Sequence, residues 1–134
     1  MVLDEALLLK KLRDTFRAEA PQKLRLLRRW LFEACRDQAA ADLNRSDFLR
    51  ELHNLKGISR IAGLPAIQNL CAGSERILRV GAYPPDKKEA YETIMEAFQQ
   101  IEDLIPGDEA PAELAQDLCS RLSSFAPEES LENV

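Results

Sequence analysis

The sequence predicts an all-α protein built around a single core, on three observations. The 134-residue chain contains abundant leucine and alanine but only 6% aromatic residues, a composition that favours helices over sheets. Apolar residues recur every three or four positions along most of the chain, which is the spacing of one helix face. No stretch alternates apolar and polar residues as a half-buried strand does. At 46% hydrophobic and 31% charged residues, the composition is that of a folded globular domain.

The N-terminal part of the chain has two helical stretches. The first covers residues 3–18, where Asp4 and Glu5 suit the positively polarised first turn of a helix. The second runs from Pro21 to about residue 37, because proline is well tolerated at the first helical position. The same residues also fit one helix bent at the proline, and the pattern alone does not choose between these alternatives.

The next helix follows a short connection that we expect over residues 39–43. Asn44 or Ser46 is the candidate N-cap, since both side chains can accept a hydrogen bond from the first turn. The helix should end near Ala62, where Gly63 can adopt the left-handed conformation that often closes a helix.

Three more helices are expected in the C-terminal half. They span residues 64–81, 86–105 and 111–125. Pro106 and Gly107 end the middle one. We therefore divide the chain into a helical bundle over residues 1–107 and an extension over residues 108–134, which is a short helix followed by an acidic disordered tail.

The most informative stretch surrounds His53, the only histidine in the chain. On a helix with 100° per residue, one face near it forms a continuous stripe that we expect to be buried, made of Phe48, Leu52, Leu55, Ser59 and Ala62. His53 faces away from this stripe, and its neighbours on the exposed face are Leu49, Arg50, Lys56, Gly57 and Arg60. Glycine inside a helix costs about 1 kcal/mol relative to alanine, and its missing side chain leaves space beside the imidazole for a bulky anion. A solvated histidine on a charged face fits the same geometry.

A compact motif follows the histidine. It reads His53-x-Leu55-Lys56-Gly57, with Gly63 ten residues after the histidine, then Leu64, Leu70-Cys71 and Glu75. The pattern resembles the signature of histidine-containing phosphotransfer (HPt) domains, and the resemblance covers roughly residues 12–105. It implies an up-down four-helix bundle, here with an additional N-terminal helix and a short C-terminal helical extension. Asn54, Arg60 and Ile61 differ from the residues usual in that family, which bears on partner choice more than on chemistry.

The resemblance also implies roles for the residues near the histidine. His53 would carry a phosphoryl group between receiver-domain aspartates, because a neutral imidazole nitrogen is a competent nucleophile. Lys56 would balance the transferred charge, and Gly57 would give clearance. From its angle on the helix, Arg60 is a candidate second cation. Glu75 either helps to orient His53 or is an ordinary surface carboxylate.

A receiver domain would need a complementary surface beside the reactive nitrogen. The helical angles place Leu49 and Ile61 outside the buried stripe, and Leu64 follows at the helix end. We expect these residues to form a small exposed apolar patch, with Arg50 and Arg60 at its rim selecting acidic partners. The alternative is that Ile61 and Leu64 turn inward and seal the end of the bundle.

The sequence argues against an autonomous enzyme. There is no second histidine for metal or base chemistry, no Ser-His-Asp set and no nucleotide-binding segment, so we expect neither a cofactor nor self-phosphorylation. The resemblance places Mg²⁺ on the partner receiver domain instead. A histidine-kinase dimerisation domain usually has an acidic residue after its histidine, and here that residue is Asn54. The alternative function is a helical binding module that docks receiver domains or kinases without carrying phosphate.

Charge and cysteine content indicate which partners and which cellular compartment to expect. The net charge is −5, with basic residues concentrated in residues 10–36 and acidic residues in 89–134. Since those cations alternate with leucines at helical spacing, a solvated helix face is favoured over nucleic-acid binding. No apolar run reaches 18 residues, the acidic N-terminus is unlike a signal peptide, and the three cysteines lack metal-ligand partners. We expect a cytoplasmic monomer whose partners are response-regulator receiver domains and a hybrid histidine kinase.

Overall fold

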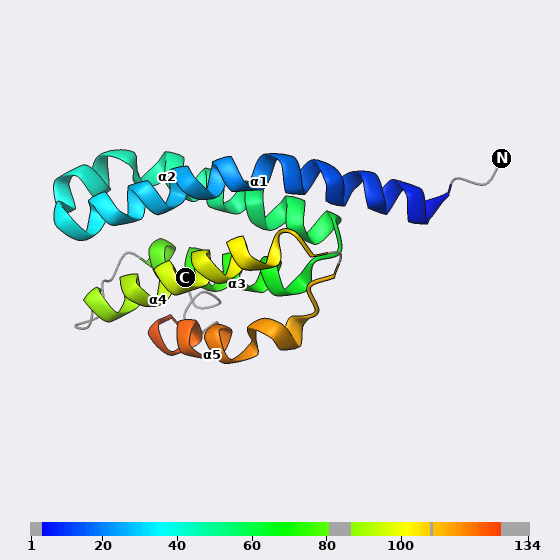
Figure 1. Ribbon diagram of the computed structural model, residues 1–134. Helices are drawn as coiled ribbons and strands as arrows, with labels where there is room; N and C mark the ends of the chain where they lie inside the picture. The colour runs from blue at the N-terminus through cyan, green and yellow to red at the C-terminus, as the bar shows by residue number, and fades with distance from the viewer. Residues whose placement is uncertain (1–3, 81–86, 108, 127–134) are drawn as a thin grey trace.

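The computed structural model describes residues 4–80, 87–107 and 109–126, except the side chains of residues 38–43, 80 and 87. Within them the elements are α1 (Glu5–Arg36), α2 (Gln38–Ile61), α3 (Pro65–Val80), α4 (Lys87–Leu104), a short 3₁₀ helix η1 (Ala112–Ala115) and α5 (Gln116–Phe125). Helices α1 to α4 form an up-down bundle, and α5 lies on the side of α3 and α4 that is remote from α1 (Figure 1). The described residues contain no strand, so the all-α prediction is confirmed.

Helix α1 decides between the two alternatives left open for the N-terminal part. Its 32 residues form one helix that contains Pro21, so the expected extra N-terminal helix is the first part of α1 and not a separate element. Proline inside a helix removes a hydrogen bond and costs about 3 kcal/mol. The helix continues because both halves bury side chains in the same core, among them Ala20 before the proline and Leu24 after it.

The expected connection over residues 39–43 is wrong. Helix α2 begins at Gln38, and only Asp37, with extended backbone angles of φ −144° and ψ 108°, separates it from α1. Asn44 and Ser46 therefore lie inside α2 and do not cap it. The physical reason is the high helix propensity of the alanines at positions 39, 40 and 41, which extend the helix N-terminally.

The C-terminal end of α2 is as predicted. Gly63 has φ +70°, the left-handed conformation that glycine adopts without strain. Its N–H donates to the carbonyl of Arg60 at 3.1 Å, and the N–H of Leu64 donates to the carbonyl of Ser59 at 3.0 Å. These two bonds are those of a Schellman motif, which fixes where the helix carrying His53 ends.

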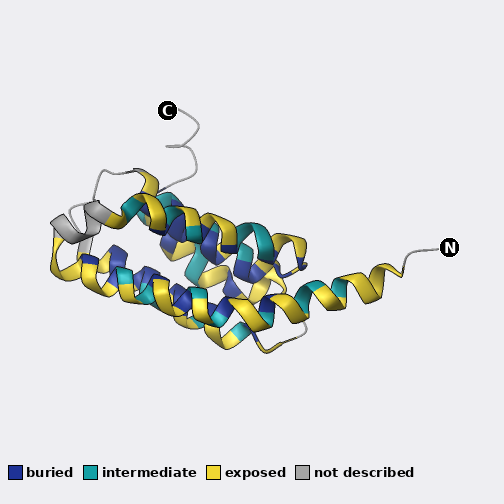
Figure 2. Cartoon of the chain, turned by 90° about the horizontal axis from the view of Figure 1, so that it is seen from above, coloured by how far each residue is buried: buried dark blue, intermediate teal, exposed yellow. Residues whose placement is uncertain are grey.

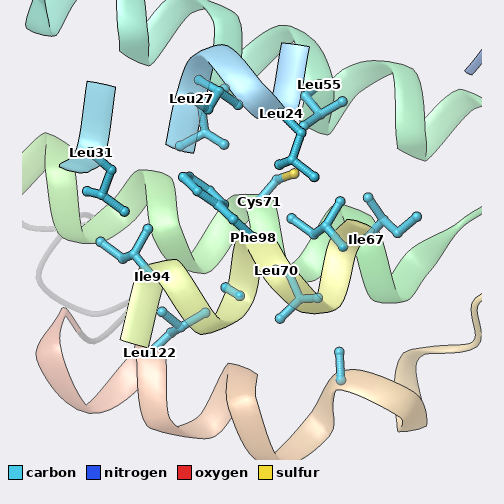
Figure 3. Close-up of a cluster of buried hydrophobic side chains, with 14 of the residues drawn as sticks. Leu24, Leu27, Leu31, Leu55, Ile67, Leu70, Cys71, Ile94, Phe98 and Leu122 are labelled. Atoms are coloured by element: carbon cyan, nitrogen blue, oxygen red, sulfur yellow. The ribbon is translucent and has the colours of Figure 1, made fainter. Parts of the chain in front are cut away.

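The core lies between the four bundle helices and extends to α5. Figure 3 shows buried side chains from α1, α2, α3, α4 and α5 packed in one cluster, among them Leu27, Leu55, Leu70, Phe98 and Leu122. Figure 2 shows buried positions facing the interior of the bundle, whereas the first turns of α1 are largely exposed and project beyond it.

The predicted C-terminal helix over residues 111–125 is present as η1 and α5. Leu122 of α5 is fully buried and packs on Gly73 of α3. The predicted ends near residues 81 and 86 lie outside the described residues, as does the acidic tail beyond Ala126.

Replacing Gly73 with valine should destabilise the fold by about 1–3 kcal/mol, the usual cost of overpacking. A Cβ atom at Gly73 would lie 3.0 Å from Cδ1 and 3.1 Å from Cβ of Leu122, so the Leu122 side chain must give way. Gly57→Val is the matched control, because a Cβ there meets nothing within 4 Å. Urea unfolding measures both free energies, and equal effects at the two glycines would contradict this packing.

Candidate phosphotransfer site

His53 projects from the exposed side of α2, as its helical position predicts. Its side chain is 57% exposed, while the adjacent Leu52 and the nearby Leu55 are fully buried. The apolar stripe therefore fixes the rotation of α2 about its axis and presents the imidazole at the surface.

A buried carboxylate on α3 holds one nitrogen of this imidazole. Glu75 is only 6% exposed in its side chain, and its Oε2 lies 2.9 Å from Nδ1 of His53. Lys56 donates from Nζ to Oε1 of Glu75 at 2.6 Å, and Arg79 donates from Nη2 to Oε2 at 3.1 Å. Of the two alternatives for Glu75, the structure supports contact with His53. Arg79 was not among the residues predicted for this site, although Glu75 and Arg79 have the i,i+4 spacing of a helical ion pair.

The charge state of Glu75 follows from these contacts. Burial raises the pKa of the Glu75 carboxyl, but hydrogen bonds from Lys56, Arg79 and His53 and the charge of Lys56 outweigh burial and lower the pKa below its ordinary value. Glu75 is therefore ionised at neutral pH, and its contribution to stability is lost only as the pH falls below the ordinary glutamate range.

The ionised carboxylate also selects the tautomer of the imidazole. Because a carboxylate oxygen can only accept a hydrogen bond, Nδ1 of His53 must carry the proton. In the neutral ring the lone pair then lies on Nε2. No described residue forms a hydrogen bond with Nε2, so this nitrogen is free to act as a nucleophile.

The two residues next in the motif have distinct surroundings. Lys56 is 27% exposed in its side chain and is held by Glu75, so its charge is partly offset. Gly57 faces open space, since a Cβ built on it meets nothing within 4 Å. The clearance that the sequence predicted beside His53 is present.

Cys71, one turn before Glu75, does not compete with His53 as a nucleophile. It is fully buried, and burial together with the nearby charge of Glu75 raises the pKa of its thiol, against a smaller opposing effect of Lys56. The thiol therefore stays protonated at neutral pH, and only a thiolate would be reactive.

The three apolar docking candidates have different exposures. Ile61 is 59% exposed, near the end of α2. Leu49 is partly buried and packs against the core. The expectation that Leu64 belongs to an exposed patch is wrong, because it is only 2% exposed. Leu64 follows the left-handed Gly63, where the chain leaves the helix, and the turn directs its side chain inward to seal the bundle end.

Both cationic docking candidates are exposed. Arg50 pairs with Asp47 on its own helix at 2.8 Å. The guanidinium of Arg60 pairs with no other described residue, and Arg60 lies two turns beyond His53 on α2. Lys56 and Arg79, and not Arg60, are the cations that contact Glu75.

The described residues contain neither a cluster of metal ligands nor a membrane-spanning helix. No group of three or more His, Cys, Asp or Glu side chains among them could hold a metal ion. No helix in the described part of the chain is long and apolar enough to cross a membrane.

Comparison with known proteins agrees with this geometry. The family model of the Hpt domain matches residues 11–125, which include His53, Glu75 and all of α2 to α5. Because the match covers far more than half of the chain, this protein belongs to the Hpt domain family, the class of histidine phosphotransfer domains of phosphorelays. No curated protein and no solved structure matches the chain significantly.

Proposed function

We propose that this protein is an intermediate in a two-component phosphorelay. It accepts a phosphoryl group on His53 from a receiver-domain aspartate and passes it to another receiver. The observation that supports this most is the exposed imidazole whose Nδ1 is held by the buried, ionised Glu75. We propose that the protein acts in the cytoplasm and that its partners are a hybrid histidine kinase and response-regulator receiver domains.

The chemistry requires little of this chain beyond positioning. Nε2 of His53 attacks the phosphorus of the aspartyl phosphate, an N–P bond forms, and the bond from phosphorus to the aspartate oxygen breaks. The aspartate leaves as a carboxylate, and the phosphorylated ring keeps its proton on Nδ1 and becomes cationic. Glu75 stabilises that positive charge through the Nδ1–H hydrogen bond.

The cations at Glu75 have a positioning role. Lys56 and Arg79 contact different oxygens of the carboxylate, which fixes its plane against His53. Lys56 is also partly exposed next to the imidazole, so we propose that it balances the incoming phosphoryl charge. Mg²⁺, where needed, would be held by the receiver domain.

The direct test is transfer from a purified receiver carrying a radiolabelled aspartyl phosphate. We expect the label to appear on this chain as an acid-labile, alkali-stable adduct, the behaviour of a phosphohistidine. A chain that binds the receiver but never becomes labelled would be a docking module, and the proposal would be wrong.

Gly57→Leu should slow transfer by about tenfold or more without destabilising α2. The leucine side chain would occupy the open space beside His53, and leucine is the better helix former. Gly57→Ala is the matched control, because it adds one methyl group and should transfer at nearly the native rate. Native rates in both variants would mean that the phosphoryl group does not approach over Gly57.

Ile61→Asp should weaken receiver binding by about tenfold while the melting temperature stays nearly constant. Ile61 is the large apolar residue on the described part of α2 that is exposed, about two turns beyond His53, whereas Leu49 packs on the core and its replacement would also affect folding. We expect micromolar affinity for the native chain, about −8 kcal/mol, because relay contacts must also break quickly. Leu114→Asp, at a similarly exposed leucine on η1, is the control, and unchanged binding of Ile61→Asp would place the docking face elsewhere.

A further inference from the structure

The N-terminal turns of α1 carry exposed apolar side chains that phosphotransfer does not explain. Leu7 and Leu8 are 50% and 47% exposed, on the part of α1 that projects beyond the bundle in Figure 2. Arg13 marks where α1 reaches the end of α2, since its Nε donates to the carbonyl of Ala62 at 2.9 Å. The Hpt family match begins at residue 11, after both leucines.

The charges beside these leucines make the projecting surface self-complementary. Leu7, Leu8 and Lys11 have the spacing i, i+1, i+4 and share one face of α1. Asp4 is the N-cap residue just before them: its Oδ1 accepts from the N–H groups of Ala6 and Leu7, and the residue is exposed. The face has an acidic residue at one end, a basic residue at the other and two leucines between them. Lys11 is exposed and pairs with no described residue, so its charge is available to a partner.

We propose that this face, Asp4, Leu7, Leu8 and Lys11, binds the same face of a second copy of this chain in an antiparallel pair. A twofold axis between residues 7 and 8 places Asp4 of each copy opposite Lys11 of the other. The four leucines meet between these two ion pairs and lose their contact with water. A parallel pair would instead place like charges together at both ends.

The size of the face determines the strength of this association. Stable interfaces bury about 1,200–2,000 Å², and about two turns of helix from each copy bury less than that. The dimer is therefore weak and forms at high protein concentration, and the expected monomer describes dilute solution. The face does not include His53, so the proposal is independent of the proposed function.

The test is sedimentation equilibrium of the full chain up to about millimolar concentration. We expect concentration-dependent dimerisation that Leu8→Asp weakens at least tenfold. Leu26→Asp is the matched control, because Leu26 is a 60% exposed leucine on the same helix but outside the face, and its replacement should leave dimerisation unchanged.

A second pair of variants tests the charges. Lys11→Glu places two acidic groups together at each end of the pair and should abolish dimerisation. Lys10→Glu makes the same charge change one residue away, where the lysine pairs with Asp14 of its own chain at 3.7 Å, and should have a much smaller effect. A native chain that stays monomeric at millimolar concentration, or equal effects within either pair of variants, would overturn the proposal.

Discussion

His53→Gln is expected to abolish phosphoryl transfer and leave the helical bundle intact. His53 is the only histidine, and a glutamine amide nitrogen has no basic lone pair with which to form a bond to phosphorus. The side chain is 57% exposed, so its replacement should change the free energy of unfolding by no more than about 0.5 kcal/mol. Transfer from a labelled receiver and the circular dichroism melting curve measure the two effects.

The variant should also bind a receiver domain with nearly native affinity, because glutamine preserves a polar side chain beside Glu75. Measuring receiver binding and phosphoryl transfer on the same variant separates loss of the chemical step from loss of receiver binding. Label on the His53→Gln chain would show that another residue accepts the phosphoryl group.

Glu75→Gln is expected to slow transfer by about tenfold to a hundredfold. The amide can still contact Nδ1 of His53 but lacks the negative charge that stabilises the cationic phosphorylated ring, and it presents an NH₂ group to either the ring or Lys56. A charged hydrogen bond contributes about 1.5–3 kcal/mol, and 1.4 kcal/mol corresponds to a factor of ten in rate. Single-turnover transfer measures the change.

The control for this variant is Glu51→Gln. Glu51 is also a helical glutamate with a lysine partner, Lys23 at 3.6 Å, but its side chain is 41% exposed, and we expect no effect on transfer. The free energy of unfolding should also depend on pH differently in the native chain and in Glu75→Gln. The native chain should lose the contribution of Glu75 as the pH falls below the ordinary glutamate range, and Glu75→Gln should lack that part of the loss. Native transfer rates in Glu75→Gln would contradict the role of the carboxylate.

Features set by local sequence were predictable from the chain alone. The buried stripe on α2 fixed the outward direction of His53. Gly63 marked the end of α2, because glycine adopts without strain the left-handed conformation that ends this helix. The clearance over Gly57 followed from the same helix geometry.

Features set by contacts between distant residues were not predictable in this way. Pro21 fitted both a helix start and one helix bent at the proline, and it is the burial on both sides of it that holds α1 together as one helix. The helical angle of Leu64 has no meaning once the chain turns at Gly63, so its burial could not be read from periodicity. Glu75 lies on another helix, 22 residues from His53, and only the packing of α2 on α3 brings the two together.

The most direct test of the central claim is to identify the nitrogen of His53 that carries the phosphoryl group. Nuclear magnetic resonance of the ¹⁵N-labelled chain can report this from the single imidazole, before and after phosphorylation. We predict that Nδ1 carries a proton hydrogen-bonded to Glu75 in the free protein, and that transfer forms an Nε2–phosphorus bond with the Nδ1 proton retained. Phosphorylation on Nδ1, or no change in the histidine signals after incubation with a phosphorylated receiver, would contradict it.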